Sequence, residues 1–339
     1  MPNTAPSSSD ARTSTRRMKT IVQHEYGGPE ALHLDERPVP APDDEEVLVK
    51  VQAASVNAGD WHLMRGRPFL VRFMAGGLFR PTATIGSDVA GTVEALGPKA
   101  SQFDLGDAVI GDLSTSGFGG FAEYACVPEA VLIPKPESLS LKDAAAVPVA
   151  GLAALQGLRD CGHIEAGQHV LINGASGGVG TFAVQIAKAF GATVTAVCSP
   201  EKMDAVQSLK PDRVIDYEQE DVTQLDTAYD LILDAAAYRS PRAYLDILRP
   251  GGTYVLVGGS PARLFQVMFL APVVSIPREN TIEVLLSSPN QEDLHTLSDL
   301  IDDGKLAPLI DRRFSLGDVP DAIQYVEARR GCGKVVITM

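Results

Sequence analysis

Short runs in which apolar and polar residues alternate fill the first part of the chain. From about Met18 to Leu139 these runs are separated by glycine and proline, which end strands and form turns. A period of two at this spacing predicts a curled, mainly antiparallel sheet or a partial barrel. We expect its strands at 19–22, 46–53, 88–96 and 106–110.

The pattern changes after a helix expected at 149–159. Apolar runs then alternate with helical stretches, which is typical of a parallel sheet covered by helices on both faces. A final strand is expected to return to the first region. The strands of the second region are expected at 170–172, 193–197, 213–215, 229–233 and 252–257, two later helices at 291–302 and 318–328, and the final strand at 334–338.

One turn in this second region predicts a specific chemistry. An apolar run at 169–172 leads into Asn-Gly-Ala-Ser-Gly-Gly-Val-Gly at 173–180, and a helical stretch follows at 181–190. Glycine lets the backbone approach phosphate oxygens, and the free N–H groups of a first helical turn attract an anion. The order of strand, turn and helix therefore predicts a dinucleotide pyrophosphate site, although alanine replaces the first glycine of G-x-G-x-x-G and an ordinary glycine-rich loop is the alternative. The candidate residues are Gly174, Ala175, Ser176, Gly177, Gly178, Val179 and Gly180.

The end of the strand at 193–197 bears on which dinucleotide binds. A protein that selects NAD places a carboxylate there, against the ribose 2′-hydroxyl. This chain instead has Ser199 and Lys202, a neutral donor and a cation that suit a 2′-phosphate. NADPH is therefore favoured over NADH. Glu201 keeps NAD open as an alternative, and Lys202 could also be a solvated residue at the start of a helix at 201–209.

Composition and charge exclude several classes of protein. The 339 residues are 45% hydrophobic and 21% charged, which suffices for a large core and about two domains. A formal net charge of -14 argues against nucleic acid as the main partner. The apolar segment 264–276 is too short to span a bilayer and contains Pro272, so we expect no membrane span and a cytoplasmic protein.

Four cysteines lie far apart in the sequence. Their spacing contains no C-x-x-C pair and no histidine suited to a metal, so neither a disulfide framework nor a zinc cluster is indicated. Reduced thiols are the expected state. The cysteines are Cys126, Cys161, Cys198 and Cys332.

Taken together, several motifs resemble those of the medium-chain dehydrogenase/reductase superfamily, and within it the quinone oxidoreductase group. The resemblance implies an α/β fold in which a GroES-like β-barrel domain is interrupted by a doubly wound, parallel-sheet Rossmann domain. We then expect a disordered tail at 1–17, the first part of the GroES-like domain at 18–145, the Rossmann domain at 146–287 and the return to the GroES-like domain at 288–339. The motifs lie at 56–61, 86–93, 106–107, 120–124, 174–180, 214–217, 249–252 and 333–336.

Zinc alcohol dehydrogenases share this fold, and the ligands distinguish the two groups. Their metal needs a cysteine soon after the strand that here ends at Ser55, and Gly-His-Glu where this chain reads Gly-Ser-Asp at 86–88. Neither ligand is present, so no metal site is expected. Asp60 and Asp88 could imitate hard ligands, but carboxylates satisfied within the protein are the simpler interpretation.

Without a metal to polarise a simple ketone, the substrate must accept hydride readily. Quinones and α,β-unsaturated carbonyls do so because the added charge delocalises onto oxygen. We therefore expect an NADPH-dependent, zinc-independent oxidoreductase with a small quinone or enone as its partner. An alcohol dehydrogenase of the same superfamily and a non-catalytic NADPH-binding sensor or structural protein are the alternatives.

The resemblance also implies roles for single residues. Asn57 would orient the substrate oxygen or merely hold the turn before Asp60, which would fix the loop. His62 would donate a proton or be a surface histidine. For the cofactor, Lys202 and Tyr217 match residues that hold the 2′-phosphate, Arg329 or Arg330 is a loose match for a further basic residue, and Val257, Gly258 and Gly259 would pass beside the nicotinamide.

Two larger features complete the expectations. The apolar segment 66–80 is expected either as a lid over the active site or as a core helix of the barrel domain. The resemblance suggests a homodimer formed through the edges of the Rossmann sheets, with 252–257 and 281–286 as contact strands.

Overall fold

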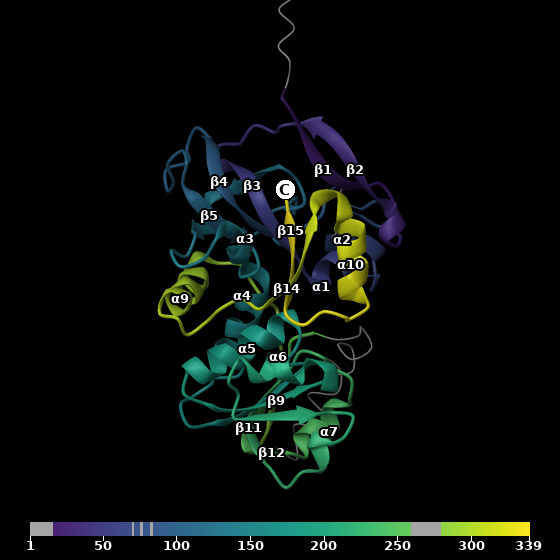
Figure 1. Cartoon of the computed structure of the whole chain (residues 1–339), viewed down its shortest axis with the longest axis vertical. Helices are drawn as coiled ribbons and strands as arrows, with labels where there is room; N and C mark the ends of the chain where they lie inside the picture. Colours follow the sequence, from purple (N-terminus) through teal and green to yellow (C-terminus); the bar gives the residue numbers. More distant parts are fainter. Residues whose placement is uncertain (1–15, 70, 75–76, 82–83, 259–278) are drawn as a thin grey trace, which may run out of the picture.

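The computed structural model describes residues 16–69, 71–74, 77–81, 84–258 and 279–339. Two bodies follow one another along the long axis of the molecule (Figure 1). The first and last parts of the chain build the upper body, and the middle part builds the lower one. The expected return of the last strand is confirmed, because the C-terminal strand pairs antiparallel with a strand near residue 50.

The upper body contains a curled sheet with the order β14-β15-β3-β4-β5-β7. Strand β6 pairs with the first part of β3, residues 46–50, which β15 leaves unpaired. Its pairs are antiparallel except for β14 with β15. A separate ribbon is formed by β1 and β2. The strands are β1 (Arg17–Gln23), β2 (Leu32–Pro38), β3 (Glu46–Val56), β4 (Asp88–Leu96), β5 (Ala108–Asp112), β6 (Tyr124–Pro128), β7 (Leu132–Pro134), β14 (Ile310–Ser315) and β15 (Lys334–Thr338).

Several of the expected boundaries in this body are wrong, including two at strand starts. Arg17 was expected in the tail, but it opens β1 and pairs with Pro38. The strand expected from residue 106 begins at Ala108, because Gly106 and Asp107 form the turn before it.

The lower body is a six-stranded parallel sheet with the order β10-β9-β8-β11-β12-β13. The order reverses between β8 and β11, which is the point where open α/β sheets bind ligands. This confirms the expected Rossmann-type sheet; the domain boundaries at 145/146 and 287/288 stay a prediction. The strands are β8 (His169–Asn173), β9 (Thr193–Cys198), β10 (Arg213–Asp216), β11 (Tyr229–Asp234), β12 (Leu248–Leu256) and β13 (Thr281–Val284).

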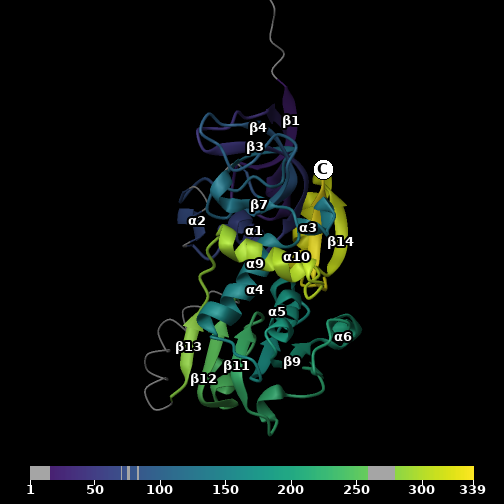
Figure 2. The ribbon, with the colours of Figure 1, turned by 90° about the vertical axis from the view of Figure 1, so that its left-hand side faces the viewer.

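Helices cover both sheets and join them. Figure 2 shows α4 and α9 between the two bodies. The helix expected at 149–159 is α-helical only as far as Gln156, after which a π-helical turn spans Gly157–Cys161. The α-helices are α1 (Ala58–Arg65), α2 (Val71–Met74), α3 (Leu141–Ala144), α4 (Pro148–Gln156), α5 (Gly178–Ala189), α6 (Met203–Gln207), α7 (Pro241–Leu245), α9 (Gln291–Asp302) and α10 (Val319–Glu327).

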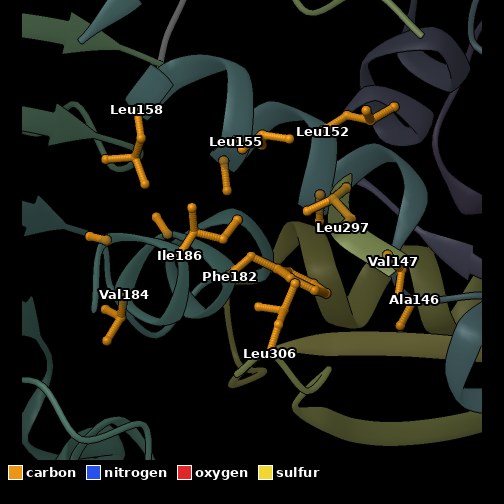
Figure 3. Close-up of a cluster of buried hydrophobic side chains, with 14 of the residues drawn as sticks. Ala146, Val147, Leu152, Leu155, Leu158, Phe182, Val184, Ile186, Leu297 and Leu306 are labelled. Atoms are coloured by element: carbon orange, nitrogen blue, oxygen red, sulfur yellow. The ribbon is translucent and has the colours of Figure 1, made fainter. Parts of the chain in front are cut away.

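The largest apolar core lies around α4, which is buried on every side. Figure 3 shows Leu152 and Leu155 of α4 close to Phe182 of α5 and Leu297 of α9. The contact with α9 is close, since a Cβ on Gly151 would lie 2.9 Å from Leu297 Cδ1. Because α4 packs against both α5 and α9, this core connects the parallel sheet to the upper body.

One expected dimer strand is contradicted by the topology. The stretch 252–257 belongs largely to β12, which pairs with β11 on one side and β13 on the other, so its backbone has no free edge. Only β13 lies at that end of the described sheet. In the described part of the chain, no helix combines the length and the apolar character that a membrane crossing requires.

Candidate active site

The glycine turn at the end of β8 has the geometry expected of a phosphate cradle. Gly174 has a φ of +79°, in the left-handed region that favours glycine. Gly177 caps α5, and a Cβ on Gly180 would lie only 2.1 Å from the Gly174 carbonyl oxygen. The helix can therefore start against the strand only because these positions carry no side chain. The first N–H groups of α5 are the donors that would meet a phosphate.

A buried carboxylate fixes the strand ends beside this turn. Asp234, at the end of β11, accepts a hydrogen bond from Asn173 Nδ2 at 2.7 Å and one from the Tyr254 hydroxyl at 2.7 Å. It also accepts the Ala237 N–H at 2.7 Å. Asp234 therefore joins β8 to β11 at the point where the strand order reverses, which holds the glycine turn in place.

The C-terminal strand of the upper body reaches the same turn. The Gly333 N–H donates to the Ser176 carbonyl oxygen at 2.8 Å. A Cβ on Gly178 would lie 3.0 Å from Lys334 Cδ, so the lysine stem runs along the start of α5. Sequence reasoning named Lys334 only as part of a family motif. Its position before the apolar run Val335, Val336 and Ile337 was the available indication that it is buried.

A polar network is buried between the two bodies. Lys334 is 2% exposed, Asp88 is 0% exposed and Asn57 is 8% exposed. Lys334 Nζ donates to Asn57 Oδ1 at 2.5 Å and lies 3.4 Å from Asp88 Oδ2. Asn57 Nδ2 donates to Asp88 Oδ2 at 2.8 Å. The orientation of the amide is thus determined, because an ammonium can only donate and a carboxylate only accepts.

Asp88 connects this network to the rest of the fold. Its Oδ1 accepts the Val149 N–H at 2.9 Å, at the start of α4, and the Ser55 hydroxyl donates to its Oδ2. The carboxylate is therefore satisfied by groups of the chain itself, which agrees with the simpler interpretation of Asp88.

Asp60 holds the start of α1. Its Oδ2 accepts the Asn57 N–H at 2.7 Å, which is one half of a capping box, and the Ser87 hydroxyl lies 3.3 Å from its Oδ1. Complete burial, with the nearby charge of Asp88 in the same direction, raises the pKa of Asp60 to about 7 against the lowering effects of the Asn57 N–H and Lys334. Asp60 thus fixes the loop, as expected.

The donor set does not fit a zinc ion. The positions that would carry Cys and His ligands hold Asn57 and Ser87, and both neighbouring carboxylates accept hydrogen bonds from the chain. The Lys334 ammonium contacts the Asn57 amide oxygen, so a cation placed there would be repelled. No group of three or more His, Cys, Asp or Glu suited to a metal is found among the described residues.

His62 is half-buried, and its contacts do not suit a proton donor. Its Nδ1 lies 2.8 Å from the Arg67 carbonyl oxygen, and its ring packs on Trp61 with centroids 3.6 Å apart. Burial lowers the pKa of His62. Since a carbonyl only accepts, Nδ1 carries the proton and Nε2 of the neutral ring has none to give. This arrangement argues against His62 as the proton donor.

The residues expected around a 2′-phosphate are brought together from both bodies. Lys202 Nζ donates to the Arg329 carbonyl oxygen at 2.8 Å, and the Arg329 guanidinium lies 4.9 Å from the ring centroid of Tyr238. Tyr217 follows β10, and its ring centroid is 6.4 Å from that of Tyr238. Tyr238, which is 58% exposed, was missed because an aromatic residue in a loop has no pattern of its own. Of the two arginines considered, Arg329 makes these contacts.

Ser199, three residues before Lys202, is held by Glu201. The Ser199 hydroxyl donates to Glu201 Oε1 at 2.5 Å, and this bond lowers the pKa of Glu201. The serine would have to leave the carboxylate to bind a phosphate. Glu201 therefore works against the cation of Lys202 here, as the alternative preference for NAD supposed.

The remaining expected site residues are placed only in part. The Val257 N–H donates to the Asp234 carbonyl oxygen at 3.0 Å, and Gly258 follows it; Gly259 lies outside the described residues. In the segment 66–80, Phe69, Phe73 and Phe79 are 60%, 65% and 89% exposed. The described phenylalanines of this segment therefore do not belong to a core helix, and the lid stays a prediction.

Comparisons with known proteins agree with this geometry. Residues 43–137 match the family described as alcohol dehydrogenase GroES-like domain, and residues 209–337 match that described as zinc-binding dehydrogenase. A chloroplast envelope quinone oxidoreductase homolog of Arabidopsis thaliana is 30% identical over 332 residues, which cover 94% of this chain and 98% of that protein. The chloroplastic NADPH-dependent alkenal/one oxidoreductase of the same plant is 32% identical over 336 residues, with coverages of 95% and 80%. The solved quinone oxidoreductase of Coxiella burnetii superposes with a TM-score of 0.86 at 30% identity, covering 96% of this chain and all of that one (100%).

A GroES-like barrel joined to a parallel sheet with a glycine turn at its switch point defines a nicotinamide-dependent dehydrogenase or reductase. The relatives narrow this class further. The chain belongs to the quinone oxidoreductase group of the medium-chain dehydrogenase/reductase superfamily, as its motifs predicted.

Two glycine substitutions should separate cofactor binding from folding. Gly177→Ala places a methyl group in ordinary van der Waals contact, 3.4 Å from the Gly174 carbonyl oxygen, so we expect an unchanged melting temperature and NADPH binding weakened at least about tenfold. Gly180→Ala places it against the backbone, so we expect a loss of about 1–3 kcal/mol of stability. Calorimetry measures the stability of each variant, and NADPH fluorescence titration measures its affinity for the cofactor. Normal binding by Gly177→Ala would contradict the cradle.

Asp60 should make the stability of the protein depend on pH. Its pKa is raised to about 7 in the folded state, above the value of 3.8 for a free side chain. Its contribution is therefore fully present below about pH 4 and is lost as the pH rises through 7, by on the order of 2–4 kcal/mol. Asp60→Asn should remove this decline in urea titrations from pH 4 to 8. The exposed control Asp226→Asn should keep the decline of stability with pH. If stability declined equally with pH in wild type and in Asp60→Asn, the assignment of this decline to Asp60 would be refuted.

Proposed function

We propose that this protein is an NADPH-dependent, zinc-independent oxidoreductase that reduces quinones or α,β-unsaturated carbonyls. The observation that carries the proposal is the contact of Gly333 and Lys334 with the glycine turn, because it brings the cofactor turn and the buried Asn57 network into one site. Relatives named quinone oxidoreductase and NADPH-dependent alkenal/one oxidoreductase support the same reaction class.

When bound, NADPH supplies the hydride. The glycine turn and the first N–H groups of α5 would hold its pyrophosphate. Lys202, Tyr217 and Arg329 would hold its 2′-phosphate, and the exposed ring of Tyr238 would flank them. The guanidinium and ammonium groups favour the doubly charged phosphate over a hydroxyl.

Asn57 would contact the nicotinamide end through its oxygen. Its Nδ2 donates to Asp88 and lies 3.4 Å from the Ser55 carbonyl oxygen, so both amide protons are directed into the protein. What Asn57 can offer is the second lone pair of Oδ1. We therefore infer that it accepts a hydrogen bond from a cofactor donor, and that it does not donate to the substrate oxygen as the resemblance suggested.

The acceptor class follows from the electrostatics of the site. A simple ketone requires a Lewis acid or a strong proton donor to stabilise the charge that develops on its oxygen. The buried ammonium of Lys334 is already neutralised by Asp88, so it is not available as a strong electrophile. A conjugated acceptor spreads the charge itself, which is why quinones and enones fit this site best.

A direct assay tests the proposal. Purified protein is mixed with NADPH and a panel of quinones and alkenals, with and without EDTA, and its metal content is measured. We expect NADPH oxidation that EDTA does not reduce. Tight NADPH binding without oxidation of any acceptor would favour a sensor or structural protein, and stoichiometric zinc with alcohol oxidation would favour an alcohol dehydrogenase.

Lys202 should set the preference for NADPH. Lys202→Ala removes one cation from the phosphate pocket, so we expect NADPH affinity to fall about 10- to 100-fold while NADH affinity stays unchanged. Fluorescence titration with both cofactors measures this difference. Lys142→Ala, which removes an exposed lysine of α3, is the matched control. An equal loss for NADPH and NADH would exclude Lys202 as the 2′-phosphate ligand.

We also propose a homodimer in the cytoplasm. Of the two strands expected at the dimer contact, β13 has the edge position in the described sheet, and its four side chains alternate between exposed and half-buried. Light scattering that gives only the mass of a monomer would contradict the proposed homodimer. The chloroplast location in the names of the plant relatives applies to those proteins.

A further inference from the structure

Lys334 is buried to an extent that lysine almost never reaches without a specific partner. It belongs to β15, yet its ammonium contacts a side chain that begins α1, 277 residues earlier in the sequence. Its backbone N–H donates to the Leu309 carbonyl oxygen at 2.8 Å, which fixes the base of the side chain. A lysine that served only the solubility of the protein would be exposed and would make none of these contacts.

We propose that Lys334 is a positioning residue for hydride transfer, acting by fixing the Asn57 amide and tying it to the glycine turn. This inference rests on the proposed function. Lys334 itself need not touch the acceptor. Its role is to decide which atom of Asn57 meets the cofactor and where that atom lies.

Two opposite charges are required for this role. The Lys334 ammonium selects the amide oxygen, and the Asp88 carboxylate selects the amide nitrogen. If the amide turned over, its N–H groups would face the ammonium and its oxygen would face the carboxylate, and both contacts would be repulsive. The pair therefore leaves Asn57 a single orientation.

The same residue is attached to the cofactor turn. Its neighbour Gly333 donates to Ser176 O, and its own stem runs past Gly178 at the start of α5. A shift of the turn therefore moves the ammonium, and with it Asn57. Since a misplacement of about 1 Å can reduce a rate about 100-fold, this attachment is relevant to catalysis.

Kinetics of four variants test the proposal. Lys334→Met removes the cation, and Lys334→Met combined with Asp88→Asn removes both charges, which protects against misfolding caused by an unpaired carboxylate. We expect kcat to fall about 100-fold, a larger isotope effect with NADPH deuterated at C4, and an NADPH Kd within about fivefold of wild type. Lys334→Arg should recover part of kcat. Lys305→Met, which breaks an exposed lysine–aspartate pair at 2.8 Å, should change nothing.

A double-mutant cycle separates positioning from general damage. If Lys334 acts through Asn57, Lys334→Met should cost less than about threefold in an Asn57→Ala background. Equal losses in both backgrounds would overturn the proposal. So would a loss confined to NADPH affinity, which would make Lys334 a phosphate ligand.

A spectroscopic measurement does not depend on turnover. The chain has five asparagines, so selective ¹⁵N labelling resolves their side-chain amides, and Asn57→Ala identifies the signal of Asn57. We expect slow exchange of the Asn57 amide protons with water in cofactor-free wild type and in Lys305→Met, and at least about tenfold faster exchange in Lys334→Met. Unchanged exchange in Lys334→Met would overturn the proposal.

The outcome for wild type distinguishes the two proposals. If wild type oxidises no NADPH with any acceptor, the proposed function fails and the positioning role falls with it. If wild type is active and the Lys334 variants match it in kcat, isotope effect and amide exchange, only the positioning role fails.

Discussion

A buried ammonium group must find an anion and hydrogen-bond acceptors, and in this protein that requirement joins segments that are far apart in the sequence. Lys334 obtains its partners from Asp88 on β4 and Asn57 before α1. Asp88 in turn accepts the Val149 N–H at the start of α4. The pairing of β15 with β3 makes this possible, because it carries the last residues of the chain into the first body. The site is thus assembled only when the whole chain has folded.

This dependence explains why the glycine turn and the network differ in how far they could be predicted. The turn is local: strand, glycines and helix are consecutive, so the sequence alone identifies it, and Gly174 and Gly180 have the expected geometry. The network is non-local, since its members come from three separate parts of the chain. A lysine before an apolar strand indicates burial, but its partners follow only from the order of the strands.

The secondary structure follows the same division. Buried strands such as β9 were predicted closely because their apolar runs are bounded by residues that end strands, here Gly191 and Pro200. Strands β2 and β14 were missed because most of their side chains are polar and at least partly exposed, so they lack a buried face that alternation could reveal. The short strands β6 and β7 were also missed, although most of their residues are buried. Arg329 illustrates the intermediate case: its place after a helix was evident, but a left-handed φ of +56° at the end of α10 was needed to bring it to Lys202 and Tyr238.

The two ends of the candidate cofactor site therefore differ in how far their polar groups are exposed to water. Around Lys202, Tyr217 and Tyr238 the groups are exposed or half-buried, so water and salt weaken their charges and substitutions there should change affinity without disturbing the fold. Around Lys334 and Asn57 the groups are buried, so their charges interact strongly, and a donor or acceptor left without a partner there would cost free energy. Such a network tolerates few arrangements. Selection of the cofactor can then vary at the exposed end, while the geometry at the buried end stays fixed by the fold itself.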